Sequence, residues 1–197
     1  MRIPDSGGEP VSVADSDREH GEITQRCAQV LPGGKAVLFT SHTAVTGFDD
    51  ASIVVMSLDN HQRKRLVPGA LFGRYVAGPD GEDYLLYLSR GTLFGVRFDK
   101  KQLAVKGTPV PLVYEVGYNI ASGSAQFDIS KNGTLVYRGA GAGGGLVSVH
   151  WLETGGHSQP LSLKPGAYLF PSVSPEGNRL VLGLGGGRGV VGLGRGT

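Results

Sequence analysis

Short apolar runs alternate with glycine-containing turns along most of the chain. The turns end at Gly34, Gly81, Gly133 and Gly177, and they are followed by the runs KAVLFTS, DYLLYLS, TLVYRG and NRLVLGL. These runs are rich in Val, Leu, Phe and Tyr, which suit the pleated surface of a β-sheet. Glycine and asparagine accept the positive φ that tight hairpins require. The pattern therefore predicts successive β-hairpins.

The four turn glycines also mark an internal repeat, because they lie 47, 52 and 44 residues apart. Each period divides into four strands: one before the turn, one after it, then a third such as ASIVVMSLD and a fourth such as QRKRLV. Periods in the forties with four strands each are typical of β-propeller blades. A single blade cannot bury its own apolar faces, so we expect adjacent blades to stack.

The repeat predicts an all-β fold, a β-propeller fragment over residues 1–184. The expected parts are three full blades at about 25–67, 70–113 and 120–164, partial blades at 7–15 and 168–184, and a glycine-rich disordered tail at 185–197. A closed propeller usually has four to eight blades. The sequence thus resembles a piece of a longer propeller, unless its first and last strands pair into one composite blade.

Composition narrows the function classes. Glycine is abundant at 33 residues, charged residues are sparse at 18%, and the formal net charge is only +2. The densest basic cluster, Arg63-Lys64-Arg65, suits an exposed edge strand, so we expect no nucleic-acid partner. The single cysteine, Cys27, excludes an internal disulfide and is expected to be a small buried residue.

No apolar run approaches the ~18 residues that a membrane-spanning helix needs, and MRIPDSGGEP is unlike a signal peptide. As written, the chain is expected to stay in the cytoplasm.

The turns PGGKAVLF, GPDGEDYLLY, SKNGTLVY and SPEGNRLVL resemble TolB-like (WD-like) β-propeller repeats, and Ser174-Pro175-Glu176-Gly177 matches that pattern best. The segments HTAVTGFDDASIVVMSL and GTPVPLV look like the propeller region C-terminal to bacterial membrane serine/threonine protein kinases. This resemblance implies a bacterial, extracytoplasmic module that senses or binds partners. Kinase motifs are absent from the sequence, so no kinase activity is implied.

Candidate chemistry is sparse. His42 with Asp49 and Asp50 supplies hydrolase-like residue types on one loop, and these would be tested first in an enzyme, although a solvated loop tip is the commoner outcome. The five histidines share no metal-ligand spacing, so no metal site is predicted. The glycine-rich segment 139–147 precedes an expected strand, which argues against a dinucleotide site. We therefore expect no cofactor.

The longest loop, SHTAVTGFDDA, is the favoured binding surface, because long loops often carry function. Aromatic residues near the first strands would line a propeller channel, although ordinary blade packing also explains them. The candidate binding residues are Thr43, Thr46, Phe48, Asp49, Asp50, Tyr75, Tyr118 and Tyr168, with Phe170 beside them. The leading hypothesis is a non-catalytic binding or sensing module for a protein or peptide partner. The alternative is a hydrolase with its active site on propeller loops, and open blade edges would allow self-association.

Overall fold

The computed structural model describes residues 1–43, 48, 50–78, 80–119, 122–140, 149–152, 156–161, 163, 168–184 and 190–194. Within these ranges the only helix is the single 3-10 turn η1 (Arg18–His20). None of the described segments is a helix long and apolar enough to cross a membrane.

Four antiparallel sheets follow one another along the chain, and each joins strands in sequence order. Sheet 1 contains β1 (Thr24–Val30), β2 (Ala36–His42), β3 (Ser52–Ser57) and β4 (Arg63–Pro68). Sheet 2 contains β5 (Leu71–Ala77), β6 (Asp83–Ser89), β7 (Thr92–Asp99) and β8 (Ala104–Val113). Sheet 3 contains β11 (Phe127–Ile129), β12 (Leu135–Arg138), β13 (Val149–Leu152) and β14 (Ser158–Pro160). Sheet 4 contains β15 (Tyr168–Val173), β16 (Arg179–Leu184) and β17 (Val190–Gly194).

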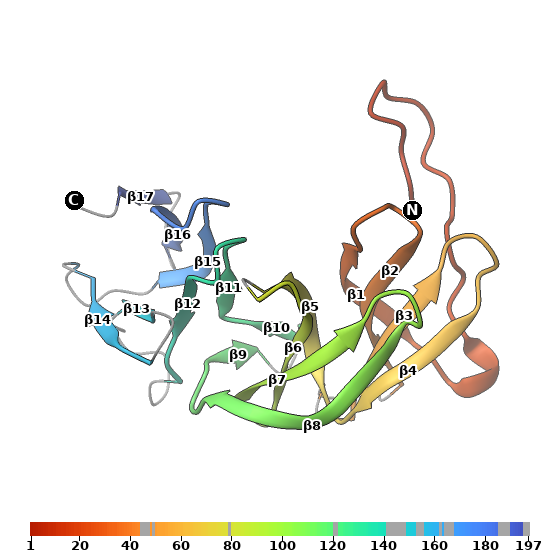
Figure 1. Ribbon diagram of the computed structural model, residues 1–197. Helices are drawn as coiled ribbons and strands as arrows, with labels where there is room; N and C mark the ends of the chain where they lie inside the picture. Colours follow the sequence, from red (N-terminus) through yellow and green to blue (C-terminus); the bar gives the residue numbers. More distant parts are fainter. Residues whose placement is uncertain are drawn as a thin grey trace.

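These sheets confirm the prediction of an all-β propeller fragment with three four-stranded blades. A small hairpin, β9 (Tyr118–Asn119) with β10 (Ser124–Ala125), separates sheets 2 and 3. The sheets are arranged in an arc, with the first strands β1, β5, β11 and β15 toward its middle and β4 and β8 along its outer rim (Figure 1). The two chain termini lie toward opposite ends of this arc (Figure 1).

Apolar side chains fill the space between every pair of consecutive sheets, because alternate residues of one strand point to opposite faces. In β6, Leu85 and Tyr87 pack toward sheet 1, whereas Leu86 and Leu88 pack toward sheet 3. A third cluster, which includes Val136, Trp151 and Leu180, joins sheets 3 and 4. Sheets 2 and 3 are therefore covered on both faces by their neighbours.

Polar side chains connect the first strands of neighbouring sheets. The N–H of Tyr75 in β5 donates to Oε1 of Gln29 in β1 (2.7 Å), and Nε2 of Gln29 donates to the Tyr75 carbonyl (3.2 Å). Across sheets 3 and 4, the N–H of Val173 donates to Oδ2 of Asp128 (2.9 Å). We call Gln29 and Asp128 the clamp residues. They satisfy edge groups that no strand ladder reaches.

A β-bulge recurs in the first strands of sheets 1, 2 and 4, between Arg26 and Gln29, Leu71 and Arg74, and Leu169 and Ser172. The first residue inside each bulge is Cys27, Phe72 or Phe170, and each has a positive φ, of 56°, 55° and 49°. Non-glycine residues adopt this conformation only where tertiary contacts hold it. The recurrence shows that the three strands are built to one plan.

The two ends differ from the sequence-based expectation. Residues 7–15 form no propeller strand. Their only ladder contact is the isolated bridge between Val11 and Arg2, because Val13 and Ala14 pack onto the face of sheet 1 instead. This differs from the expected partial blade at 7–15, and none of these residues pairs with a described strand of sheet 4 to make a composite blade.

At the other end, the expected tail at 185–197 contains strand β17. All five of its residues pair with β16, from Arg179 opposite Gly194 to Gly183 opposite Val190. This corrects the expectation of disorder for Val190–Gly194. The backbone ladder to β16 supplies the order that the glycine-rich composition did not suggest.

The segment that precedes β1 is held to sheet 1 by a buried carboxylate. Glu22 accepts from Nη1 of Arg63 (3.0 Å) and from Nε2 of Gln25 (2.8 Å). Burial raises the pKa of this carboxyl, but hydrogen bonds from Gln25, Arg63 and other neighbours outweigh burial, so the pKa lies below the ordinary value of 4.5. A lowered native pKa stabilises the fold above the unfolded-state pKa, and this contribution is lost as pH falls through the native pKa.

We expect Glu22→Gln to lower the free energy of unfolding by about 1–3 kcal/mol near neutral pH, because charged hydrogen bonds are lost. The difference from wild type should shrink as pH falls below 4.5. Urea unfolding near neutral pH and again below pH 4.5 measures the difference in the free energy of unfolding. The exposed Glu19→Gln is the matched control, and a deficit that grew in acid would contradict the assignment.

We expect Gln29→Ala to cost about 1–3 kcal/mol, because it leaves the N–H and C=O of Tyr75 without partners between two sheets. Gln62→Ala, at an exposed position after β3, should change stability by less than about 0.5 kcal/mol. Thermal unfolding followed by circular dichroism compares the two. Equal effects would show that the clamp does not stabilise the fold.

Candidate functional site

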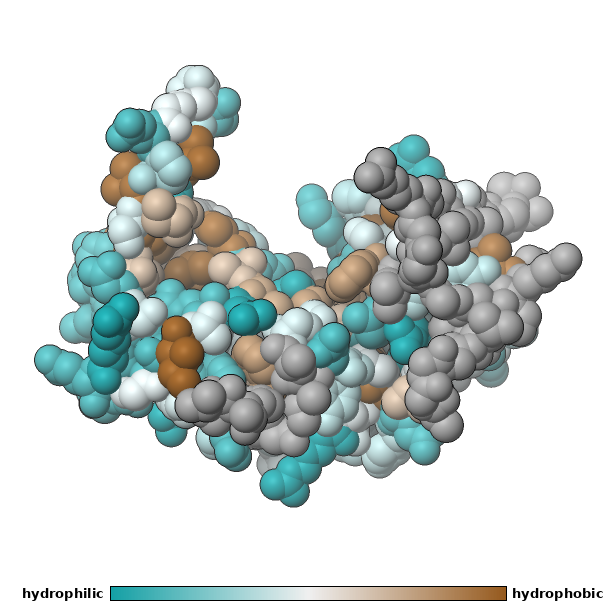
Figure 2. Space-filling model, turned by 180° about the vertical axis from the view of Figure 1, so that it is seen from behind, coloured by the Kyte–Doolittle hydropathy of each residue, from teal (hydrophilic) through white to brown (hydrophobic). Residues whose placement is uncertain are grey.

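The first strands and the β9–β10 hairpin bring together a cationic and aromatic cluster that the sequence distributes over about a hundred positions. We call it the axial cluster. Its members are Arg26 and Cys27 of β1, Phe48 of the loop after β2, Phe72 and Arg74 of β5, and Gly123 of the hairpin. Seen from behind, the molecule is hollowed between its projecting N-terminal part and its C-terminal sheets (Figure 2).

Arg26 is exposed and connects sheet 1 to the hairpin. Its guanidinium lies 5.3 Å from the ring centroid of Phe48, and Nη1 donates to the Ser122 carbonyl (3.4 Å). Phe48 in turn stacks on His42, with ring centroids 4.0 Å apart and planes 14° apart. A cation over a ring that is fixed on its other face gives a preorganised surface group.

Arg74 lies deeper in the same cluster. Its guanidinium lies 3.9 Å from the Phe72 ring centroid, and Nη1 donates to the carbonyls of Cys27 (3.1 Å) and Gly73 (3.0 Å). Burial lowers the pKa of this guanidinium, while Asp128 and Cys27 act in the opposite direction. Arginine stays charged under such conditions, because its intrinsic pKa is so high.

Cys27 is half-buried, with Sγ 3.9 Å from the Gly123 carbonyl oxygen. Burial raises the pKa of its thiol, although Arg74 and Arg26 oppose the change. A thiol with a raised pKa is a poor nucleophile near neutral pH. Cys27 is therefore not set up as a nucleophile, and it is less buried than its position in the sequence predicted.

The chemistry of the axial cluster favours an anionic group. Among the described residues, no carboxylate forms an ion pair with Arg26 or Arg74. Guanidinium groups bind carboxylates through paired, charge-assisted hydrogen bonds, and the adjacent rings offer apolar contact. The described residues contain no group of three His, Cys, Asp or Glu side chains that could hold a metal ion.

The predicted loop residues fall partly in this cluster. Phe48 belongs to it and is buried, while Thr43 and Asp50 are exposed beside it. His42 is only 4% exposed, under the ring of Phe48. Thr46 and Asp49 lie outside the described residues, as do positions 141–147 of the glycine-rich segment at 139–147.

The structure does not bring the three predicted tyrosines together. Tyr75 packs between sheets 1 and 2, where its hydroxyl donates to Asp83. Tyr168 is buried between sheets 3 and 4, and Tyr118 packs against the cluster between sheets 2 and 3. Their positions match ordinary blade packing, the other explanation that the sequence offered.

Sequence reasoning missed Arg26 and Arg74. Each interrupts a first strand, in TQRCAQV and LFGRYVA, and such an interruption was the available signal. Its meaning depends on the bulges at Cys27 and Phe72, whose positive φ no sequence rule assigns to these residue types.

The arc of stacked four-stranded sheets defines a protein of the β-propeller class. In solved structures its fold is similar to that of TolB from Acinetobacter baumannii, with a TM-score of 0.57, 15% identity, and coverage of 87% of this chain and 41% of TolB. It is also similar to hydrazine synthase from Kuenenia stuttgartiensis, with a TM-score of 0.54, 17% identity, and coverage of 85% and 52%. A protein from Lactobacillus plantarum gives a TM-score of 0.55 at 14% identity, with coverage of 100% and 60%.

No protein-family model and no curated protein sequence matches the chain. Identities this low show the fold alone, which is TolB-like. The chain spans between 41% and 60% of the length of these three structures.

The contact between Phe48 and Gly123 gives a sharp test of the axial cluster. A Cβ added at Gly123 would lie 2.5 Å from the Phe48 ring, at a φ of +68°. Gly34 has the same φ, and a Cβ there would meet nothing within 4 Å. We expect Gly123→Ala to destabilise the protein by about 1–3 kcal/mol more than Gly34→Ala, because only Gly123→Ala adds overpacking to backbone strain. Equal losses in urea unfolding would contradict this packing.

Proposed function

We propose that this chain is a non-catalytic binding or sensing propeller module. It binds a protein or peptide segment through the acidic side chains of that segment. The axial cluster is the proposed binding site of the segment, and the 43–50 loop lies beside it. From that loop Thr43 and Thr46 would hydrogen-bond the partner, and Asp49 and Asp50 would contact its uncharged or basic positions, since carboxylates repel its acidic side chains. Phe48 fixes the base of the loop against the cluster.

The observation that carries this proposal is the pair of arginines, Arg26 and Arg74, that lie near Cys27 in the axial cluster. Arg26 is exposed over an aromatic ring, and Arg74 is preorganised by two backbone carbonyls. Arginine and aromatic residues are enriched where proteins bind other proteins. The fold supports a propeller scaffold, and propellers carry function on loops and axial surfaces.

A hydrolase on these loops has weaker support. A general base must reach the proton of a bound substrate. The His42 ring is 4% exposed and stacked on Phe48, which favours a structural role.

The sequence resemblance to kinase-associated propellers supports an extracytoplasmic bacterial setting for the module. Its modest net charge of +2 does not favour nucleic acid as the partner.

The binding test uses an immobilised Glu-rich peptide and its Gln counterpart of equal length. We expect the Glu peptide alone to be retained, with affinity falling as salt rises. Arg26→Glu should weaken binding by about tenfold or more, because it reverses a charge that faces the ligand. Arg179→Glu, at an exposed arginine in β16, is the control. Equal retention of both peptides, or an unchanged affinity in Arg26→Glu, would contradict the proposal.

The loop and the hydrolase alternative are tested separately. Replacing Thr43 and Thr46 with Gly, while keeping Phe48, Asp49 and Asp50, should reduce peptide binding and leave the fold intact. A panel of ester and glycoside substrates should show no turnover. Turnover that His42→Ala abolishes, with the fold preserved, would establish the hydrolase instead.

A further inference from the structure

Each sheet of this fold has two faces with different neighbours. We call the face toward the preceding sheet the leading face and the face toward the following sheet the trailing face. Within the chain, three trailing faces meet three leading faces, and each junction is filled by one apolar cluster. The leading face of sheet 1 and the trailing face of sheet 4 have no sheet opposite them (Figure 1).

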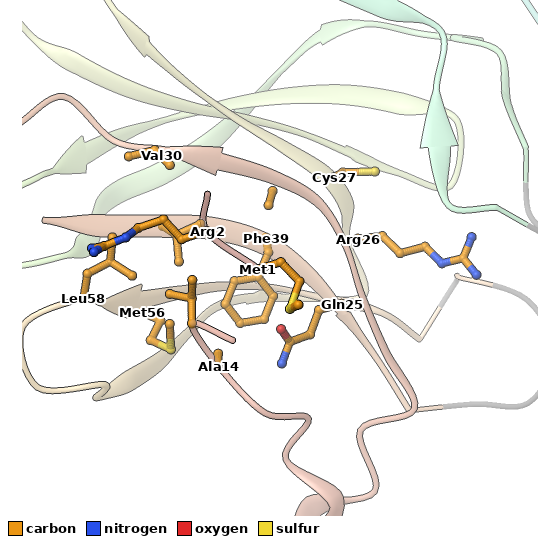
Figure 3. A pocket seen from close by; sticks show the side chains of 13 residues that line it. Met1, Arg2, Ala14, Gln25, Arg26, Cys27, Val30, Phe39, Met56 and Leu58 are labelled. Carbon is orange, nitrogen blue, oxygen red and sulfur yellow. The ribbon is translucent and has the colours of Figure 1, made fainter. Parts of the chain in front are cut away.

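The leading face of sheet 1 is covered only in part. Val13 and Ala14 pack over Phe39, Val54 and Met56. A cavity of about 310 Å³ remains beside them, and its walls include Cys27, Ala28, Val30 and Val37 of β1 and β2 (Figure 3).

Strand register identifies what this face lacks. Val30 is the second residue paired after the bulge in β1, as Tyr75 is in β5. Tyr75 is 9% exposed because sheet 1 covers it, whereas Val30 is 60% exposed. An apolar residue at a position that the next sheet buries marks an uncovered packing surface.

Backbone N–H groups also indicate that a neighbouring sheet is missing from this face. The N–H groups of Tyr75 and Val173 donate to the clamp residues of the preceding sheet. Those of Phe72 and Phe170 donate to Thr40 Oγ1 (3.0 Å) and Gln126 Oε1 (2.9 Å), also across a sheet boundary. The equivalent groups in sheet 1 are the N–H groups of Val30 and Cys27. No side chain from the described part of the protein accepts from either of them.

The complementary surface lies at the other end of the arc. Val181 in β16 pairs with Ser172, the first residue after the bulge of β15. Leu38, Leu86 and Val136 hold the same position in sheets 1, 2 and 3, and all three are buried by the following sheet. Val181 is 45% exposed. Ser172 stands where Gln29 and Asp128 act as clamp residues, so its hydroxyl can accept from an N–H of a following sheet.

We infer that two copies of this chain associate head to tail, with the trailing face of sheet 4 of one copy on the leading face of sheet 1 of the other. The occupant is a second copy because the chain itself carries both halves of a contact that it already makes three times internally. Such a contact between unlike surfaces closes into a ring or extends into a chain of copies.

The N-terminal segment is compatible with this docking. Residues 15–22 are anchored at the far side of the face through Arg63 and Gln25. Met1, Arg2, Val13 and Ala14 line the cavity from the N-terminal segment, and the bridge between Arg2 and Val11 holds the first of these. The incoming sheet would displace Met1 and Arg2 and would pack beside Val13 and Ala14, which stay on the face of sheet 1.

The test uses two charge variants and measures mass by light scattering across micromolar concentrations. Wild type should exceed the 20.6 kDa of one copy. Val30→Asp places a charge only on the leading face, and Val181→Asp places one only on the trailing face. Each variant alone should therefore be monomeric. An unpaired buried charge should weaken association by about a hundredfold or more. The exposed Val110→Asp, on β8, is the control that should associate like wild type.

Mixing the two variants shows whether the copies associate head to tail. Val181→Asp keeps an intact leading face and Val30→Asp keeps an intact trailing face, so an equimolar mixture should form dimers and nothing larger. Circular dichroism confirms that each variant is folded. A monomeric wild type, association of either variant alone, or a mixture that stays monomeric would overturn the inference. Because Arg26 also lines this cavity, peptide binding is measured on the monomeric Val181→Asp variant, where a failure to bind would count against the axial cluster and not against association.

Discussion

The structure depends on one constraint, which is that sheets 1, 2 and 3 carry apolar side chains on both faces and must bury both. Strand β6 shows this directly, because Leu85 packs toward sheet 1 and the adjacent Leu86 toward sheet 3. A lone sheet would leave both faces in water, at a cost of about 25 cal/mol for each Å² of apolar surface. Sheets of this kind are therefore stable only as a stack, and the ends of the stack are its weak points.

Stacking by apolar faces alone would leave the relative position of the sheets loosely defined. The clamp residues add direction, because Gln29 bonds both the N–H and the carbonyl of Tyr75, and Asp128 accepts from the N–H of Val173. The bulges at Cys27 and Phe72 turn the first strands locally. Together these features place Arg26 and Arg74 near Cys27, each with its guanidinium over an aromatic ring. The proposed binding surface is thus a consequence of how the sheets are joined.

The same logic links function and assembly. A propeller surface that binds a partner needs rigid support, and the axial cluster takes its support from two sheets and the β9–β10 hairpin. Covering the exposed leading face of sheet 1 would stiffen β1, which carries Arg26. Ordering of that strand by a second copy would lower the entropy that peptide binding must otherwise offset.

The sequence alone determined the class of fold, because turn glycines at regular spacing and apolar strands between them depend only on local geometry. It also identified the region of Phe48. Tertiary structure decided the rest. It buried His42, separated Tyr75 from Tyr168 between different sheets, and paired the glycine-rich strand β17 with β16. It also gathered Arg26 and Arg74. These outcomes depend on contacts between residues far apart in the chain, and a local pattern of side chains carries no information about which distant backbone will lie opposite it.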